Sequence, residues 1–138
     1  MADAIAATVY MRPSEVHACL REIPLNASSA ALEVRKLSTF LQFQSTLGFL
    51  KNPPPTYDLP AVDVLGSLDN ITSRVLAGAY KNELDLERDI YHLIAIPGDG
   101  HLTAVPNLIA AFQWVTNVNL ISVSSDGTQI PEIYFAGK

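Results

Sequence analysis

The spacing of apolar residues changes near residue 97, and this change constrains the fold more than any other feature of the sequence. Residues 13–96 carry apolar side chains at intervals of three and four, which is typical of helices with one buried face. Residues 101–136 are instead rich in β-branched and aromatic residues, which favour strands. The predicted class is therefore α+β, with an N-terminal bundle of about four helices followed by a small antiparallel sheet.

Helices are predicted over four stretches, residues 13–23, 28–50, 62–79 and 82–96. Ser28 or Ser29 is expected to cap the second helix, and Asn82 the fourth. The proline-rich residues 51–60 cannot continue a helix, because proline lacks the amide donor and clashes with the preceding turn.

Strands are predicted over residues 101–105, 108–115, 118–123 and 130–135. Asp126-Gly127, between the last two, is a strong hairpin signal. Trp114 is expected to pack between this sheet and the helices.

Length and composition bound the domain organisation. A chain of 138 residues suits a single domain over residues 1–138, of which 1–12 are expected to form a flexible segment. Hydrophobic residues make up 49% and charged residues 17%, which excludes an intrinsically disordered chain. So apolar a composition favours a dimer face, a surface for a neighbouring domain or an apolar pocket.

Charge and cysteine usage narrow the partners and the compartment. The net charge is −5 and the basic residues are dispersed, which argues against nucleic-acid binding. No run of about 18 apolar residues is present, so no membrane span is predicted. The first residues lack the basic start of a signal peptide, and a single cysteine allows no internal disulfide. The predicted location is the cytoplasm.

Few residues are candidates for chemistry. Cys19 is predicted to be a buried structural thiol, because it lies on the apolar face of the first helix without a second cysteine nearby. The acidic residues between 83 and 89 form a weak candidate metal site that Arg88 interrupts; a solvated helix face is the preferred interpretation, and no metal or cofactor is predicted.

His101 is the strongest candidate, because it follows the turn Gly98-Asp99-Gly100 at the end of the fourth helix. Asp99 could accept a hydrogen bond from one ring nitrogen of His101 and leave the other as a general base. The simpler alternative is that Asp99 only closes the turn and His101 begins a strand. The predicted apolar wall beside this pair consists of Leu102, Ala104, Trp114 and Tyr91.

Several short stretches match, in order and spacing, a known protein family: CLREIPLN (19–26), FLKNPP (49–54), Tyr57, PAVDV (60–64), GSLD (66–69), DIY (89–91), DGH (99–101), VP (105–106), VSSDG (123–127) and IPEIY (130–134). Together they resemble the N-terminal region of fungal serine peptidases of the tail-processing class, which are similar to the chlamydial protease-like activity factor. The match extends over residues 16–135.

This resemblance implies that His101 corresponds to a general base whose serine lies in a later catalytic domain, beyond a PDZ-like segment. A lone base cannot carry out the serine mechanism, so no peptidase activity is expected from this chain alone. Gly98 stands where the family often has a second histidine. Leu102, Thr103 and Ala104 replace bulkier or charged residues, which could open an apolar cavity beside His101.

Two functions follow as expectations, of which the first is favoured. In the first, the chain is a cofactor-free fungal protein of secondary-metabolite biosynthesis that binds an apolar small molecule and promotes its cyclisation or isomerisation, including a Diels–Alder-type step. In the second, it is a non-catalytic regulatory domain that docks on a peptidase-like catalytic domain. A homodimer is a further possibility.

Overall fold

The computed structural model describes residues 10–115 and 118–136, which form six helices and two strands. The helices are α1 (Pro13–Arg21), α2 (Ala27–Leu41), α3 (Leu47–Lys51), α4 (Val64–Leu76), α5 (Glu83–Ala95) and α6 (Asn107–Ala110). The strands β1 (Leu120–Val123) and β2 (Glu132–Phe135) pair as a small antiparallel sheet, so the predicted α+β class is confirmed. Among the described residues, no helix combines the length and the apolar character needed to cross a bilayer.

The helices begin at residues whose side chains accept otherwise unpaired main-chain N–H groups. Asn82 accepts the N–H of Asp85 at 2.9 Å, which confirms the predicted cap of α5. At α2 the cap is Asn26, which accepts the N–H of Ser29 at 3.1 Å. The prediction of Ser28 or Ser29 is wrong by two or three residues, because the helix already begins after Asn26.

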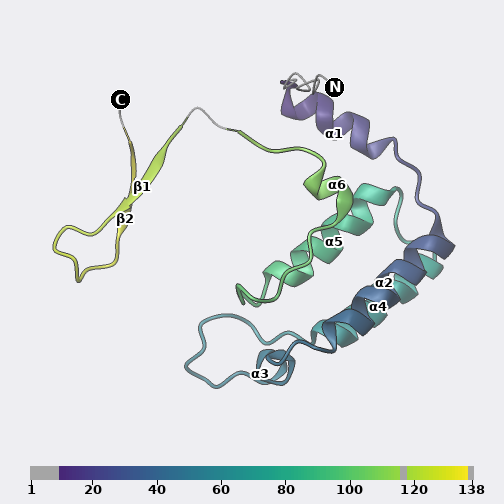
Figure 1. Cartoon of the computed structure of the whole chain (residues 1–138), viewed down its shortest axis with the longest axis horizontal. Helices are drawn as coiled ribbons and strands as arrows, with labels where there is room; N and C mark the ends of the chain where they lie inside the picture. The colour runs from purple at the N-terminus through teal and green to yellow at the C-terminus, as the bar shows by residue number, and fades with distance from the viewer. Residues whose placement is uncertain (1–9, 116–117, 137–138) are drawn as a thin grey trace, which may run out of the picture.

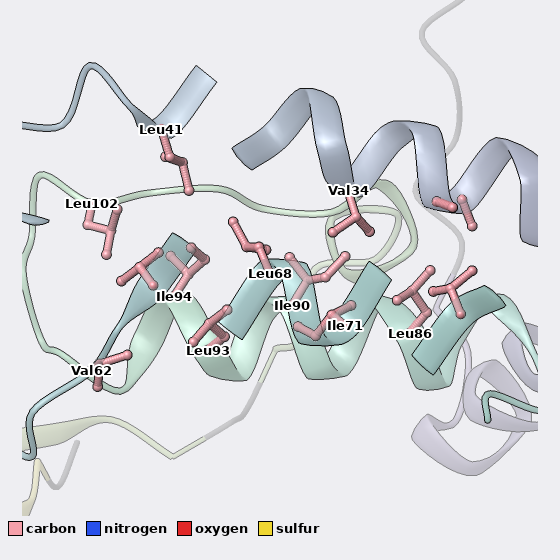
Figure 2. Packing of buried hydrophobic residues seen from close by; sticks show 14 of the residues in the cluster. Val34, Leu41, Val62, Leu68, Ile71, Leu86, Ile90, Leu93, Ile94 and Leu102 are labelled. Carbon is pink, nitrogen blue, oxygen red and sulfur yellow. The ribbon is translucent and has the colours of Figure 1, made fainter. Parts of the chain in front are cut away.

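The main hydrophobic core lies where α4 packs against α2 on one side and α5 on the other (Figure 1). The buried residues of α4 recur at intervals of three and four and include Leu68 and Val75, both 0% exposed. Figure 2 shows Leu68 pointing among Val34 of α2 and Ile90 of α5. Leu102, which follows α5, also inserts into this core and is 4% exposed. The core therefore fixes the segment that carries the predicted site.

A smaller cluster joins α1 to α5, with Val16 and Leu20 against Leu84. Cys19 lies outside this contact and is exposed, so the prediction of a buried thiol is wrong. The helix presents Val16 and Leu20 to α5, and Cys19 falls on the neighbouring face.

The predicted helix over residues 28–50 is two helices, because residues 42–46 form a turn between α2 and α3. A loop connects α3 to α4, and two interactions join the ends of this loop. Lys51 and Asp63 form an ion pair at 2.6 Å, and the N–H of Val62 donates to the carbonyl of Leu50 at 2.8 Å.

Residues 101–105 and 108–115 do not form strands, so both of these predictions are wrong. The first stretch runs back along α5 without pairing with another strand (Figure 1). Pro106 then caps the start of the short helix α6. A main-chain N–H group at this start donates a hydrogen bond to a side chain of α5. β-branched composition favours a strand only where a neighbouring strand is present to share hydrogen bonds.

The C-terminal hairpin is confirmed, with Leu120 opposite Phe135 and Val123 opposite Glu132. Asp126 accepts the N–H groups of two residues of the connecting loop, and Gly127 has a φ of +79°, a conformation that favours glycine. The hairpin stands apart from the helices (Figure 1), and every residue of both strands is exposed. The sheet is therefore not a layer of the helical core. The predicted flexible segment 1–12 lies mostly outside the described residues.

Leu68→Ala is expected to lower the free energy of unfolding by about 2–5 kcal/mol, because it leaves a cavity at the contact of three helices. Chemical denaturation followed by circular dichroism measures this change. Leu76→Ala is the matched control on the same helix, since Leu76 is 58% exposed and its truncation is expected to change stability little. Equal effects of the two substitutions would contradict the described packing.

Candidate functional site

The turn after α5 holds the predicted pair Asp99 and His101. Gly98 has a φ of +62°, and a Cβ at this position would lie 2.3 Å from a methyl carbon of Leu59. A larger residue is therefore disfavoured by the backbone conformation, whereas the contact is with the end of a flexible, exposed leucine side chain.

The Asp99 carboxylate is held by donors from two segments. One oxygen accepts the main-chain N–H of His101 at 2.9 Å. The other accepts the hydroxyl of Thr46 at 2.6 Å and the side-chain amide of Gln44 at 3.2 Å. The hydroxyl of Thr46 and the N–H of His101 keep the pKa of Asp99 below its usual value. Asp99 therefore ties the turn to the connection between α2 and α3.

The same turn is tied to the proline-rich loop, because the hydroxyl of Tyr57 donates to the carbonyl of Pro97 at 2.5 Å. His101 follows these contacts and is exposed. Within the described residues its ring makes no hydrogen bond, and Asp99 accepts the main-chain N–H of His101 instead of a ring nitrogen. The structure thus holds the backbone of His101 in place, while its ring interacts with Asp99 through charge and not through a hydrogen bond.

Four of the predicted site residues share one shallow depression of about 280 Å³: Asp99, Leu102, Ala104 and Tyr91. Leu102 contributes little surface there, because most of its side chain is buried in the main core. His101 does not line this depression. Three of the four residues of the predicted apolar wall thus line this depression, whereas Trp114 and His101 do not.

Trp114 lines a different hollow, of about 480 Å³, which we call the Trp114 groove. It lies between α1, α5 and α6, and its lining includes Leu20, Arg88, Tyr91 and Phe112. Trp114 is 60% exposed and no strand residue lines the groove. The prediction that Trp114 packs between sheet and helices is wrong, because the hairpin lies away from the helices.

A third hollow, of about 250 Å³, lies between α2, α5 and residues 103–107, and three glutamates line it. Glu87 is 8% exposed and accepts the N–H groups of Leu108 and Ile109 at 2.7 and 3.3 Å. Burial raises the pKa of Glu87, although these hydrogen bonds oppose the shift. Burial, followed by the charges of Glu87 and Glu33, also raises the pKa of Glu83.

Glu87 was predicted to lie on a solvated helix face, and its role was missed. Its carboxylate instead anchors the start of α6, where the helix dipole favours a negative charge. No local sequence signal marks this contact, because Leu108 lies 21 residues further along the chain.

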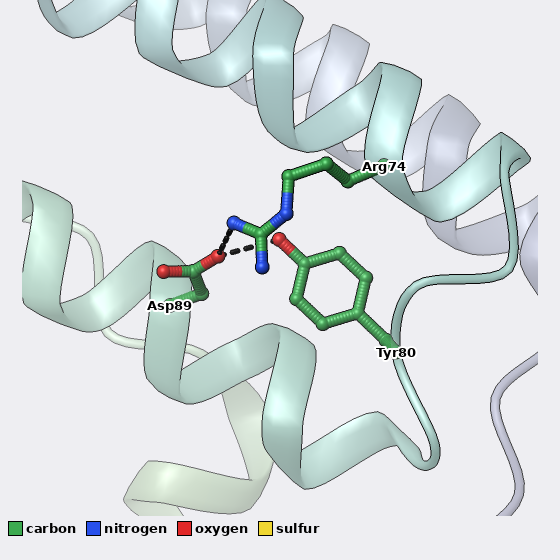
Figure 3. Close-up of polar contacts among 3 residues, drawn as sticks. All are labelled: Arg74, Tyr80 and Asp89. Atoms are coloured by element: carbon green, nitrogen blue, oxygen red, sulfur yellow. Dashed lines mark hydrogen bonds and ion pairs between the residues drawn. The ribbon is translucent and has the colours of Figure 1, made fainter.

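Asp89, another residue of the acidic stretch, forms a polar cluster with Arg74 and Tyr80 (Figure 3). One carboxylate oxygen of Asp89 accepts from Arg74 and from the Tyr80 hydroxyl, both at 2.5 Å. The guanidinium also lies 4.7 Å from the centre of the Tyr80 ring. Burial and the hydrogen bond to Asp89 raise the pKa of Tyr80. The described residues contain no group of three or more side chains suited to a metal ion.

The hairpin forms an exposed apolar surface that no sequence motif marks. On one face of the strand pair lie Leu120, Ile133 and Phe135, with exposed fractions of 59, 73 and 78%. Ile121, Val123 and Tyr134 lie on the other face and are 43–50% exposed. An exposed apolar surface of this kind is characteristic of an interaction site.

Comparison with known proteins bears on the resemblance described above. Over 81 residues the chain is 33% identical to "Peptidase S41 family protein phomP1'" and 32% identical to "Peptidase S41 family protein phomP1", both from Diaporthe leptostromiformis. This chain is similar to fungal S41 peptidase proteins. The predicted resemblance to fungal peptidases is thereby confirmed.

The similarity covers 59% of this chain but only 12% of each phomP1 protein. In those relatives the matching stretch is therefore a small part of a much longer chain. No known family profile matches the chain, and no solved structure matches it.

Asp99→Asn is expected to lower the free energy of unfolding at pH 7, because the asparagine cannot reproduce all the acceptor contacts of the carboxylate. The folded-state pKa of Asp99 is depressed, so its stabilisation is present above the unfolded-state pKa of about 3.9 and is lost as the pH falls through the folded-state value. Urea denaturation at pH 7 and at about pH 2 measures the difference, which should shrink at the lower pH.

Asp58→Asn is the control for this substitution, since Asp58 is an exposed residue of the proline-rich loop. It should leave the unfolding free energy unchanged at both pH values. A loss of stability in Asp99→Asn that is as large in acid as at neutral pH would contradict a role for the carboxylate charge.

Proposed function

We propose that the chain is a non-catalytic module of a peptidase-like protein, and that its C-terminal hairpin docks on a peptidase-like catalytic domain. The observation that carries this proposal is the exposure of Leu120, Ile133 and Phe135 on one face of a hairpin that no helix covers. The similarity to a small part of two S41-family proteins supports a partner of this class.

Energetics favour covering this face. Burial of one large apolar side chain contributes about 1.5–3 kcal/mol, before the entropic cost of association is subtracted. Three such side chains lie together, and Ile130 in the adjoining loop is 90% exposed. A two-stranded hairpin is also marginally stable by itself, so a partner that packs on it would stabilise its pairing.

Catalysis of peptide hydrolysis by this module alone is disfavoured by the geometry of the turn. In a serine triad an acid orients the histidine ring, whereas the Asp99 carboxylate is occupied by Thr46, Gln44 and the main-chain N–H of His101. The turn therefore lacks the arrangement that orients a general base. In this proposal its role is structural.

The double substitution Ile133→Lys/Phe135→Lys is expected to weaken docking by about tenfold or more, because it places two charges in an apolar contact. The partner for this experiment is phomP1' from which the matching 81-residue stretch has been deleted. Co-expression followed by size-exclusion chromatography and titration calorimetry measures the complex.

Val123→Lys is the matched control, because Val123 belongs to the same hairpin but lies on its opposite face. Docking should survive this change. The proposal fails if the unmodified chain does not bind this partner, or if the substitutions on both faces weaken binding equally.

A second candidate function is the binding and cofactor-free conversion of an apolar small molecule in fungal secondary metabolism. It is supported by the depression that Asp99, Leu102, Ala104 and Tyr91 share, and by the exposed imidazole of His101 in the adjoining turn. We rank it second because this depression is shallow and His101 does not line it.

If His101 acts as a general base, His101→Ala should slow conversion of a pathway intermediate by about 10²–10⁴-fold. The substrates to test are the intermediates of the biosynthetic genes beside this one, with product formation followed by mass spectrometry. His92→Ala, an exposed histidine at the end of α5, is the control and should leave the rate unchanged. Equal rates for the unmodified chain and His101→Ala would exclude this role.

A further inference from the structure

The Trp114 groove combines an apolar floor with one positively charged side chain, that of Arg88. Its floor is formed by Leu20 of α1, Leu84 of α5 and Leu108 of α6, which belong to the smaller hydrophobic cluster. Phe112 and Trp114 add aromatic walls. A volume of about 480 Å³ falls in the range of small-molecule sites, which is about 300–1,000 Å³.

Arg88 is the charged residue that lines the groove, and no aspartate or glutamate does. Arg88 also lines a neighbouring hollow, together with Asp85 and Asp89. Within the described residues Arg88 forms no ion pair, because the nearby Asp89 is engaged by Arg74. Several cations of the described residues have no ion pair, and Arg88 differs from most of them in lining an apolar hollow.

The chemistry of these groups selects a ligand class. The guanidinium fork matches the two oxygens of a carboxylate, and such charge-assisted pairs are stronger than neutral hydrogen bonds. The leucine floor and the aromatic walls match a hydrocarbon. The glutamate-lined hollow between α2 and α5 has the opposite charge and would repel an anion.

We propose that the Trp114 groove binds an amphipathic carboxylate, a fatty-acid-like molecule whose chain lies on the leucine floor and whose carboxylate pairs with Arg88. This site is separate from the hairpin face, and it adjoins the depression beside Asp99, with which it shares Tyr91 and Val105. It does not rest on the docking function proposed above.

Trp114 is the only tryptophan of the chain, so its fluorescence reports on this groove directly. Titration with dodecanoate, below its micellar concentration, should shift the emission to shorter wavelength and saturate. Dodecylamine, which has the same chain and the opposite charge, should bind at least about tenfold more weakly, and dodecanol should lie between them. Equal affinity for all three headgroups, or no response to dodecanoate, would overturn the proposal.

Arg88→Met should reduce the affinity for dodecanoate to that for dodecanol, because it removes the charge and keeps an extended apolar side chain. Arg35→Met, an exposed arginine on α2, is the matched control and should bind dodecanoate as the unmodified chain does. Unchanged dodecanoate binding in Arg88→Met, with helix content confirmed by circular dichroism, would exclude the Arg88 pair. The headgroup comparison on the unmodified chain remains decisive if that variant does not fold. A response to phosphatidylglycerol vesicles without any response to monomeric dodecanoate would also overturn the proposal.

Discussion

The packing of α4 between α2 and α5 is the interaction on which the other features of this protein depend. It fixes α5, and α5 supplies residues to the Trp114 groove, to the glutamate-lined hollow and to the depression beside Asp99. Glu87 anchors α6, Arg88 lines the Trp114 groove, and the C-terminal end of α5 leads into the turn of Asp99. Leu102 then returns the chain to the same core, so the segment beside the grooves is held at both ends.

The elements set by local pattern could be predicted from the sequence. The buried faces of α4 and α5, the cap at Asn82 and the hairpin around Gly127 all follow from residues within a few positions of one another. Some errors are local, such as the face of Cys19 and the cap of α2, and the others concern non-local contacts. Residues 101–115 have strand composition but no neighbouring strand. Asp99 accepts a hydrogen bond from Thr46, which lies 53 residues away in the sequence. Glu87 is buried where it binds the start of α6, although the neighbouring residues of α5 are charged.

The apolar residues that dominate the composition lie in distinct parts of the structure. Part of them form the two hydrophobic clusters, and part lie on the hairpin and in the Trp114 groove. Other apolar side chains, among them Phe40, Phe43 and Leu76, are exposed elsewhere. The two exposed surfaces differ in chemistry, since the hairpin face carries no charge among Leu120, Ile133 and Phe135 while the groove has Arg88 at its rim. Their separation allows a docked partner and a bound small molecule to be tested independently.

Amide hydrogen exchange of the chain, alone and mixed with the phomP1'-derived partner, tests the docking proposal most directly. Amides of β1 and β2 should exchange rapidly in the free chain, because every strand residue is exposed, and should become protected in the complex. The α4 core should be protected in both states. Protection that appears only around residues 99–105, or no change in the hairpin on binding, would contradict the account.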